Sequence, residues 1–253
     1  LKDVKQSSLD LFNKQTNALI VVKTIENKEK DKITEEMKKI CKEIVDIIIF
    51  VDSHRDDYNQ TIMASEYDVD LVFKSKLANE IVDLMKRIPV DQITDDFTLI
   101  ILKINIFASY QQEHQLFEMG IIQAVFRALQ CNDKVIDGRI TDIIEMVIKP
   151  KPNTLKEGQQ NPYLKQLIND GTVEKLSEII NNDNYSVFYH RKIAELIAYI
   201  FKAAPLPSDI KEKVVDQLRN GENDELCLLA ECKDNHDAIL TQTYQDKNGE
   251  IDR

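Results

Sequence analysis

The sequence predicts an all-α protein, and two observations lead to that prediction. Six of the 253 residues are Gly and six are Pro, whereas average usage would give about 30 of the two together. Because β-hairpins depend on Gly in their turns, a chain this poor in both is expected to be mostly helical with few connections. Apolar residues also recur at spacings of three and four, which is typical of amphipathic helices, and strict alternation is not sustained anywhere.

The first part of the chain shows this spacing clearly between residues 31 and 51. The apolar side chains that share one face there are Ile33, Met37, Ile40, Ile44, Ile48 and Val51. Asp31 stands where the N-cap of this helix is expected. The same spacing is clear in the predicted helix near 70–88, which Pro89 ends. The helices expected in this part run near residues 8–26, 31–51, 56–66 and 70–88.

A loop, Lys149–Asn161, separates the remaining predicted helices into two groups. Before it, helices are expected near 94–111, 113–119, 121–131 and 134–149. After it, they are expected near 163–170, 172–181, 186–203, 208–219, 223–232 and 237–244. The loop holds two Pro, one Gly and several polar residues with only Leu155 to bury, so we expect it to be mobile and the first place that a protease cuts.

Charge and hydropathy exclude several classes of function. The 33 basic and 44 acidic residues give a formal charge of −11, which argues against binding nucleic-acid phosphates or an anionic membrane surface. No apolar run approaches the roughly 20 residues that a membrane span needs. With no N-terminal signal segment and four scattered cysteines, we expect a reducing, cytoplasmic location. The start at Leu1 rather than Met suggests a piece of a longer protein.

Catalytic and metal-binding motifs are missing. The sequence has no Gly-rich phosphate loop, no nucleophile elbow and no His-Glu-x-x-His, so we expect neither an enzyme nor a cofactor. Cys227, Cys232 and His236 lie close together, but four residues between helical cysteines place them on different faces, which argues against zinc. The segment Asp246–Asp252 is similar to the middle of an EF-hand loop, but Tyr244 stands where that loop needs an oxygen ligand, so we interpret the segment as a polar tail.

Two Gly residues mark an internal repeat. Gly120 and Gly171 each separate a short predicted helix from a longer one, and they lie 51 residues apart. Subtracting a loop insertion of about a dozen residues brings the period near 40, within the range of roughly 40–47 for armadillo and HEAT repeats. One amphipathic hairpin of this length cannot bury its apolar face alone, so neighbouring repeats would bury it jointly.

The chain resembles the armadillo family at these junctions. Leu116–Ile122 and Ile168–Val173 resemble the family's turn between the first and second helices of a repeat. Leu71–Ile88 followed by Asp95–Ala108 is similar to a second and third helix, with Ser75 at the Gly position, and residues 208–219 and 223–232 resemble a last pair. The resemblance, over residues 8–232, implies a right-handed superhelix of four to five irregular repeats. We expect this domain to span 1–232, with 233–253 as an acidic polar tail or weak helix.

The resemblance also implies where a partner would bind. In the armadillo family the third helices line a concave groove, and an Asn near their C-terminal ends often holds a peptide backbone. That position falls here on Asn105, Glu145 and Ala198, so only Asn105 matches. The charged residues expected on the same faces are Asp142, Glu145, Lys149, Arg191, Glu195 and Lys202. They either contact a partner or form solvated helix faces, whereas Phe188, Tyr189, Tyr199 and Phe201 are expected mainly in the core.

The expected function is a non-enzymatic module, with an adaptor, scaffold or regulatory role, that binds a peptide or protein domain on the concave face. The alternative is a structural or regulatory segment of a larger assembly that packs against its own chain. We expect no nucleic-acid partner, no direct membrane insertion and no metal. The partner, the oligomeric state and the choice between armadillo and HEAT repeats stay open.

Overall fold

The computed structural model describes residues 10, 12–18, 39–40, 43, 69–131, 134–149, 155–219, 224–241, 244–245 and 251–252. The chain divides into two compact units, Leu1–Val147 and Ile148–Arg253. Residues 10, 12–18, 39–40 and 43 are helical, as the predictions near 8–26 and 31–51 require. The predicted helix near 56–66 lies outside the described residues.

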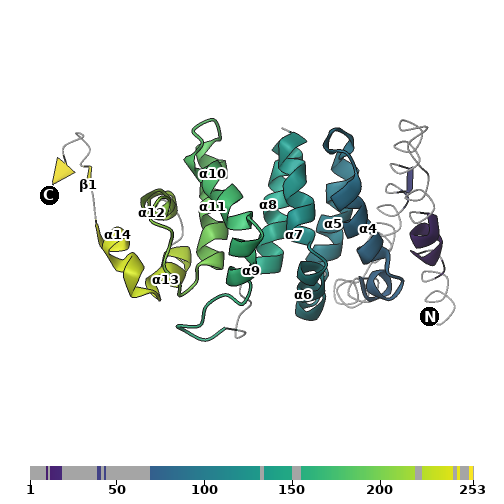
Figure 1. The fold of residues 1–253 in the computed structure, drawn as a ribbon, viewed down its shortest axis with the longest axis horizontal. Coiled ribbons are helices and arrows are strands. Elements are labelled where there is room, and N and C mark those ends of the chain that lie inside the picture. The colour runs from purple at the N-terminus through teal and green to yellow at the C-terminus, as the bar shows by residue number, and fades with distance from the viewer. Residues whose placement is uncertain are drawn as a thin grey trace, which may run out of the picture. The chain divides into compact units, whose positions relative to one another are not determined.

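From residue 69 onward, the described part of the first unit consists of helices joined by short connections (Figure 1). After helical residues 69–74, its elements are α4 Leu77–Arg87, the 3-10 turn η1 Val90–Gln92, α5 Asp95–Ile106, α6 Tyr110–Glu118, α7 Ile121–Phe126, η2 Arg127–Cys131 and α8 Lys134–Ile148, whose last residue belongs to the second unit. Its core includes Leu77, Ile81 and Met85 of α4 and Phe97 and Ile100 of α5, all almost completely buried.

The second unit is built around one central helix, α11 Val187–Ile200. The other elements are α9 Leu164–Asn169, α10 Thr172–Asn181, α12 Lys211–Arg219, α13 Asp224–Ala230, η3 Lys233–Asn235, α14 His236–Leu240 and the paired antiparallel strands β1 Tyr244–Gln245 and β2 Ile251–Asp252. Helix α11 contacts α10, α12 and α13, and it buries Ile193 and every residue from Leu196 to Ile200. Apart from the two-residue strands, the described chain is helical, and the all-α prediction is confirmed.

Each of the three junctions before α4, α7 and α10 contains a residue with left-handed backbone geometry. Lys76, Gly120 and Gly171 have φ values of 63°, 78° and 80°. The carbonyl of each accepts the first helical hydrogen bond, from Glu80, Ala124 and Lys175 respectively. The predicted match at Ser75 is therefore wrong by one residue. Ser75 instead donates its hydroxyl to Val72 O at 3.1 Å, and Lys76 makes the left-handed turn.

The boundary between α5 and α6 also differs from the prediction, which extended one helix to residue 111. Helix α5 ends at Ile106 and α6 begins at Tyr110. The reason is a capping box: the Ser109 hydroxyl accepts from Gln112 N, and the Gln112 side chain accepts from Ser109 N at 2.8 Å. These bonds satisfy donors at the start of α6 and set its first residue.

Candidate functional site

One face of α11 and of the turn after it carries a continuous row of polar and aromatic side chains. Its members, which we call the α11 stripe, are Phe188, Arg191, Lys192, Glu195, Tyr199 and Lys202. Spacings of three and four keep them on one side of the helix. Ser186 fixes the start of α11, because its side chain accepts a hydrogen bond from Tyr189 N at 3.2 Å.

Exposure decreases along the stripe from its N-terminal end. Val187 and Phe188 are 75% and 73% exposed. The side chains of Arg191 and Glu195 are 37% and 13% exposed, and Tyr199 and Lys202 are buried. The stripe is thus open to solvent at the start of α11 and covered at the end.

The four aromatic residues expected in the core divide between these two environments. Tyr199 and Phe201 are buried, which confirms the prediction for them. Phe188 is exposed in the first turn of α11, although it shares a face of the helix with the buried Tyr199. Tyr189 is half-buried and stacks on Tyr185 of the preceding loop, with ring centroids 5.1 Å apart.

The middle of the stripe is a three-residue charge cluster. Arg191 Nε donates to Glu195 Oε1 at 3.1 Å, and Lys192 Nζ lies 3.1 Å from Glu195 Oε2. The largely covered carboxylate of Glu195 is therefore held by two cations. Arg191 and Glu195, predicted separately as partner-binding residues, are brought together by the structure as one ion pair.

Tyr199 begins the covered part of the stripe. Its hydroxyl donates to Glu225 Oε1 on α13 at 2.7 Å, and Lys149 Nζ lies 4.7 Å from the centre of its ring. This cation–π distance is within the range that contributes to stability. The exposed Lys149, another predicted partner-binding residue, thus contacts an aromatic ring of α11.

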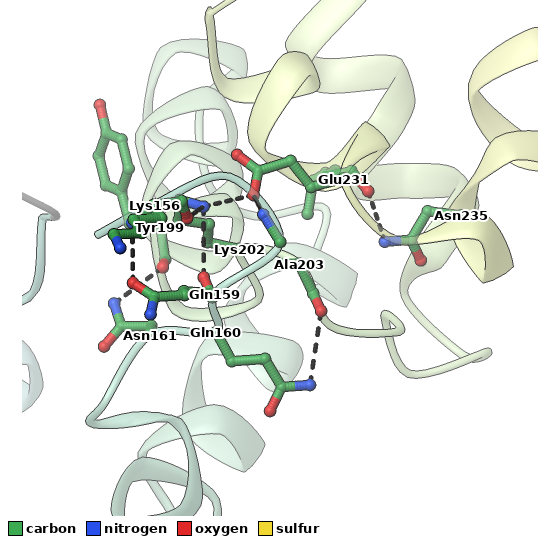
Figure 2. Close-up of polar contacts among 11 residues, drawn as sticks. Lys156, Gln159, Gln160, Asn161, Tyr199, Lys202, Ala203, Glu231 and Asn235 are labelled. Carbon is green, nitrogen blue, oxygen red and sulfur yellow. Dashed lines mark hydrogen bonds and ion pairs between the residues drawn. The ribbon is translucent and has the colours of Figure 1, made fainter.

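Lys202 is not placed to contact a partner, and the prediction for it is wrong. Its side chain is 5% exposed and forms an ion pair with Glu231. It also donates to the backbone carbonyls of Lys156 and Gln159, each at 3.2 Å. Figure 2 shows the Lys202 ammonium among these oxygens. The stripe continues to Lys202 in sequence, but the loop and Glu231 cover it.

Asn105 is also inaccessible, which corrects its assignment to a groove. It is 1% exposed, and its Nδ2 donates to Ile143 O of α8 at 3.0 Å. Among the residues that the structure describes, its buried Oδ1 finds no hydrogen-bond partner. The apolar residues around Asn105 indicated that its amide would need a partner, and the structure supplies one from α8. Asp142 and Glu145 of the first unit are half-buried on α8, and their predicted role stays a prediction.

The loop after α8 makes buried contacts through Asn161 and an exposed contact through Gly158, neither of which the sequence indicated. Asn161 Nδ2 donates to Ile148 O and Tyr199 O, each at 2.9 Å, and its Oδ1 accepts from Tyr163 N. Figure 2 shows the contact with Tyr199. Gly158 N donates to Glu231 at 2.8 Å. Asn161 precedes Pro162, a turn signal that could have marked it, whereas no local signal marks Glu231. Residues 155–161 therefore have specific anchors in the structure, and the mobility and early cleavage expected for the loop stay predictions.

The second unit holds its C-terminal elements with a similar buried amide. Asn235 Nδ2 donates to Ala204 O and Leu229 O, and its Oδ1 accepts from Leu206 N. His236 Nε2 lies 2.8 Å from Ala230 O, and Cys227 and Cys232 are free thiols. Within the described part of the chain, no three His, Cys, Asp or Glu side chains are grouped to hold a metal ion. Of the predicted tail 233–253, residues 233–240 form η3 and α14 and residues 244–245 and 251–252 form the two short strands, whereas 242–243, 246–250 and 253 lie outside the described ranges.

These features define the chain as an all-helical protein. In the ranges that the structure describes, no helix combines the length and apolarity needed to cross a bilayer. No family model matches the chain, and no curated protein matches it either.

Proposed function

We propose that the chain is a non-enzymatic protein-interaction module built from armadillo-like repeats, and that the open end of the α11 stripe contacts its partner. Three helix triplets support the repeats: residues 69–74, α4 and α5; α6, α7 and α8; and α9, α10 and α11. A left-handed residue stands between the first and second helix of each. With α12 and α13 as a last pair, the proposal extends to four to five repeats, and the resemblance to the armadillo family implies that they would form a right-handed superhelix.

One observation carries the choice of surface. Val187 and Phe188 are adjacent, and both are mostly exposed in the first turn of α11, the third helix of its triplet. The ion cluster of Arg191, Lys192 and Glu195 lies one turn further along the same face. Exposed apolar side chains beside partly covered charges are typical of interfaces, in which an apolar centre is surrounded by a polar rim.

A photo-crosslinking experiment tests this proposal. A benzoylphenylalanine at position 188, in the full chain and in a lysate of the source cells, should form an adduct of one discrete mass. Excess unmodified chain should suppress that adduct. The matched control is the same group at Ile168, which is 48% exposed on α9 and lies outside the stripe.

The outcomes separate the two candidate functions. A competed adduct at position 188 and none at 168 supports binding of a separate protein or peptide. Crosslinking only within the same polypeptide supports the alternative, a segment that packs against its own chain. Equal adducts at both positions, or none at either, would contradict the choice of surface.

A further inference from the structure

The covered end of the α11 stripe lies beneath two segments that polar contacts hold in place. The first segment, residues 155–161, is called the strap. Its residues from Lys156 to Gln160 are all exposed, so little apolar burial holds them. The second segment is α13, in which Leu229 alone is buried. Segments with few buried apolar contacts open at lower free energy than the core does.

One ion pair joins the strap to the end of α13. Lys202 donates to two strap carbonyls, those of Lys156 and Gln159, and it also contacts the Glu231 carboxylate. Glu231 follows α13 directly and accepts from the strap amide of Gly158 at 2.8 Å. Each charge therefore contacts the strap as well as the other charge (Figure 2).

The residue after Lys202 makes a second connection between the same segments. Ala203 N donates to Leu228 O of α13 at 3.1 Å, and Ala203 O accepts from Gln160 Nε2 at 3.4 Å. Ala203 has a φ of 54°, a left-handed geometry that is unfavourable for a residue with a Cβ. Opening of the strap and α13 would release this strain, and strained residues persist only where their surroundings hold them.

We propose that the Lys202–Glu231 pair is a latch, and that the strap and α13 open and close as one unit over the end of the stripe. The buried charges make the opening cooperative, because losing one partner leaves the other charge buried without compensation. Opening would uncover Tyr199, whose hydroxyl is bonded to α13 and whose carbonyl is bonded to the strap. The latch would thereby lengthen the exposed part of the stripe. This inference does not depend on the partner.

Hydrogen exchange of the full chain, followed by mass spectrometry, tests the latch. The variants Lys202→Met and Glu231→Gln each remove one charge of the pair. In both, amides of residues 156–160 and of residues 224–231 should exchange faster together, by roughly tenfold or more. The matched control is Arg191→Gln, which breaks the ion pair with Glu195 inside α11, and it should change neither set of amides.

A third variant separates coupling from simple loosening. Asn235→Ala weakens α13 from its other side, where Asn235 donates to Leu229 O at 3.0 Å. Through the latch it should also speed exchange in the strap, and this effect should disappear when Lys202→Met is added. Faster exchange confined to one of the two segments in the latch variants, or an unchanged rate in both, would overturn the proposal.

Circular dichroism shows whether each variant folds. If one does not, hydrogen exchange of the unmodified chain tests the latch instead. At low denaturant concentrations, Gly158 and the amides of α13 should report the same opening free energy and the same dependence on denaturant. Different values for the two segments would overturn the latch.

Discussion

At the scale of single residues, buried amides stabilise the second unit where short loops offer little apolar packing. Asn161 and Asn235 are 3% and 0% exposed. Each donates twice to backbone carbonyls and accepts once from a backbone amide. Removal of either side chain therefore leaves several buried backbone groups without a partner, which is costlier than losing one exposed hydrogen bond.

Asn161→Ala should lower the free energy of unfolding by about 1–3 kcal/mol, because buried carbonyls of Ile148 and Tyr199 lose a donor. Urea denaturation measures the change. Asn184→Ala is the matched control, since Asn184 is exposed, and it should change stability by less than about 0.5 kcal/mol. Equal effects at the two positions would show that the Asn161 contacts do not contribute to stability.

Breaking the Lys202–Glu231 pair and breaking the Arg191–Glu195 pair should lower the free energy of unfolding by different amounts, which urea denaturation also measures. Lys202→Ala should cost about 3–5 kcal/mol, because Glu231 stays largely buried without its counter-charge. Arg191→Ala should cost only about 0–1 kcal/mol, because Arg191 is partly exposed and Glu195 keeps Lys192. A Lys202 variant as stable as the Arg191 variant would contradict the burial of this pair.

At the scale of elements, left-handed junction residues define where the second helix of each triplet begins. Gly171 tolerates its φ of 80° because it lacks a Cβ. A Cβ there would meet only one atom within 4 Å, at 3.9 Å, so the cost of a substitution would come from the backbone rather than from a clash. Lys76 adopts a similar conformation with a side chain, and this conformation is strained.

Three substitutions test this account of the junctions. Gly171→Ala should destabilise the protein by about 1–2 kcal/mol, and Lys76→Gly should stabilise it by up to about 1 kcal/mol. Gly138→Ala is the control, because Gly138 lies inside α8 with nothing near an added Cβ, and it should stabilise by about 0.5–1 kcal/mol. Thermal or urea unfolding gives the sign of each change, and a stabilising Gly171→Ala would contradict the left-handed assignment.

The capping box of α6 supplies another prediction at this scale. Ser109→Ala removes the side-chain acceptor for Gln112 N and should cost about 1 kcal/mol. Ser109→Asp keeps an acceptor and should restore most of the loss. If both substitutions have the same effect, the cap does not set the start of α6.

The sequence predicted that the helices exist more accurately than it predicted where they end and which distant residues their side chains contact. The bounds of α10 are those expected, because Gly171 and the Asn residues after the helix are local signals. The Ser-x-x-Gln pattern at Ser109 was a usable signal that the apolar run of α5 obscured. Lys202 could not be assigned correctly from helical spacing, because its burial depends on Glu231 and on strap carbonyls that lie far away in the sequence.

At the scale of the whole molecule, several polar and charged side chains of the described second unit hold its own segments together. Asn161 and Asn235 make buried contacts, and Lys202 and Glu231 form a partly buried ion pair. The exposed start of α11 differs, because Val187 and Phe188 present apolar area to solvent. Such exposed apolar pairs contribute little to folding and can contribute strongly to binding when they lie at the centre of an interface.

The measurement that tests the proposed function most directly compares thermal stability with partner binding in the same variants. Phe188→Asp should leave the melting temperature within about 2 °C of the unmodified chain and should abolish competition for the adduct formed at position 188. Leu196→Ala, in the core of α11, should lower stability by about 2–5 kcal/mol and still compete while folded. A Phe188→Asp chain that melts early yet competes fully would contradict the account, because Phe188 would then stabilise the fold rather than bind a partner.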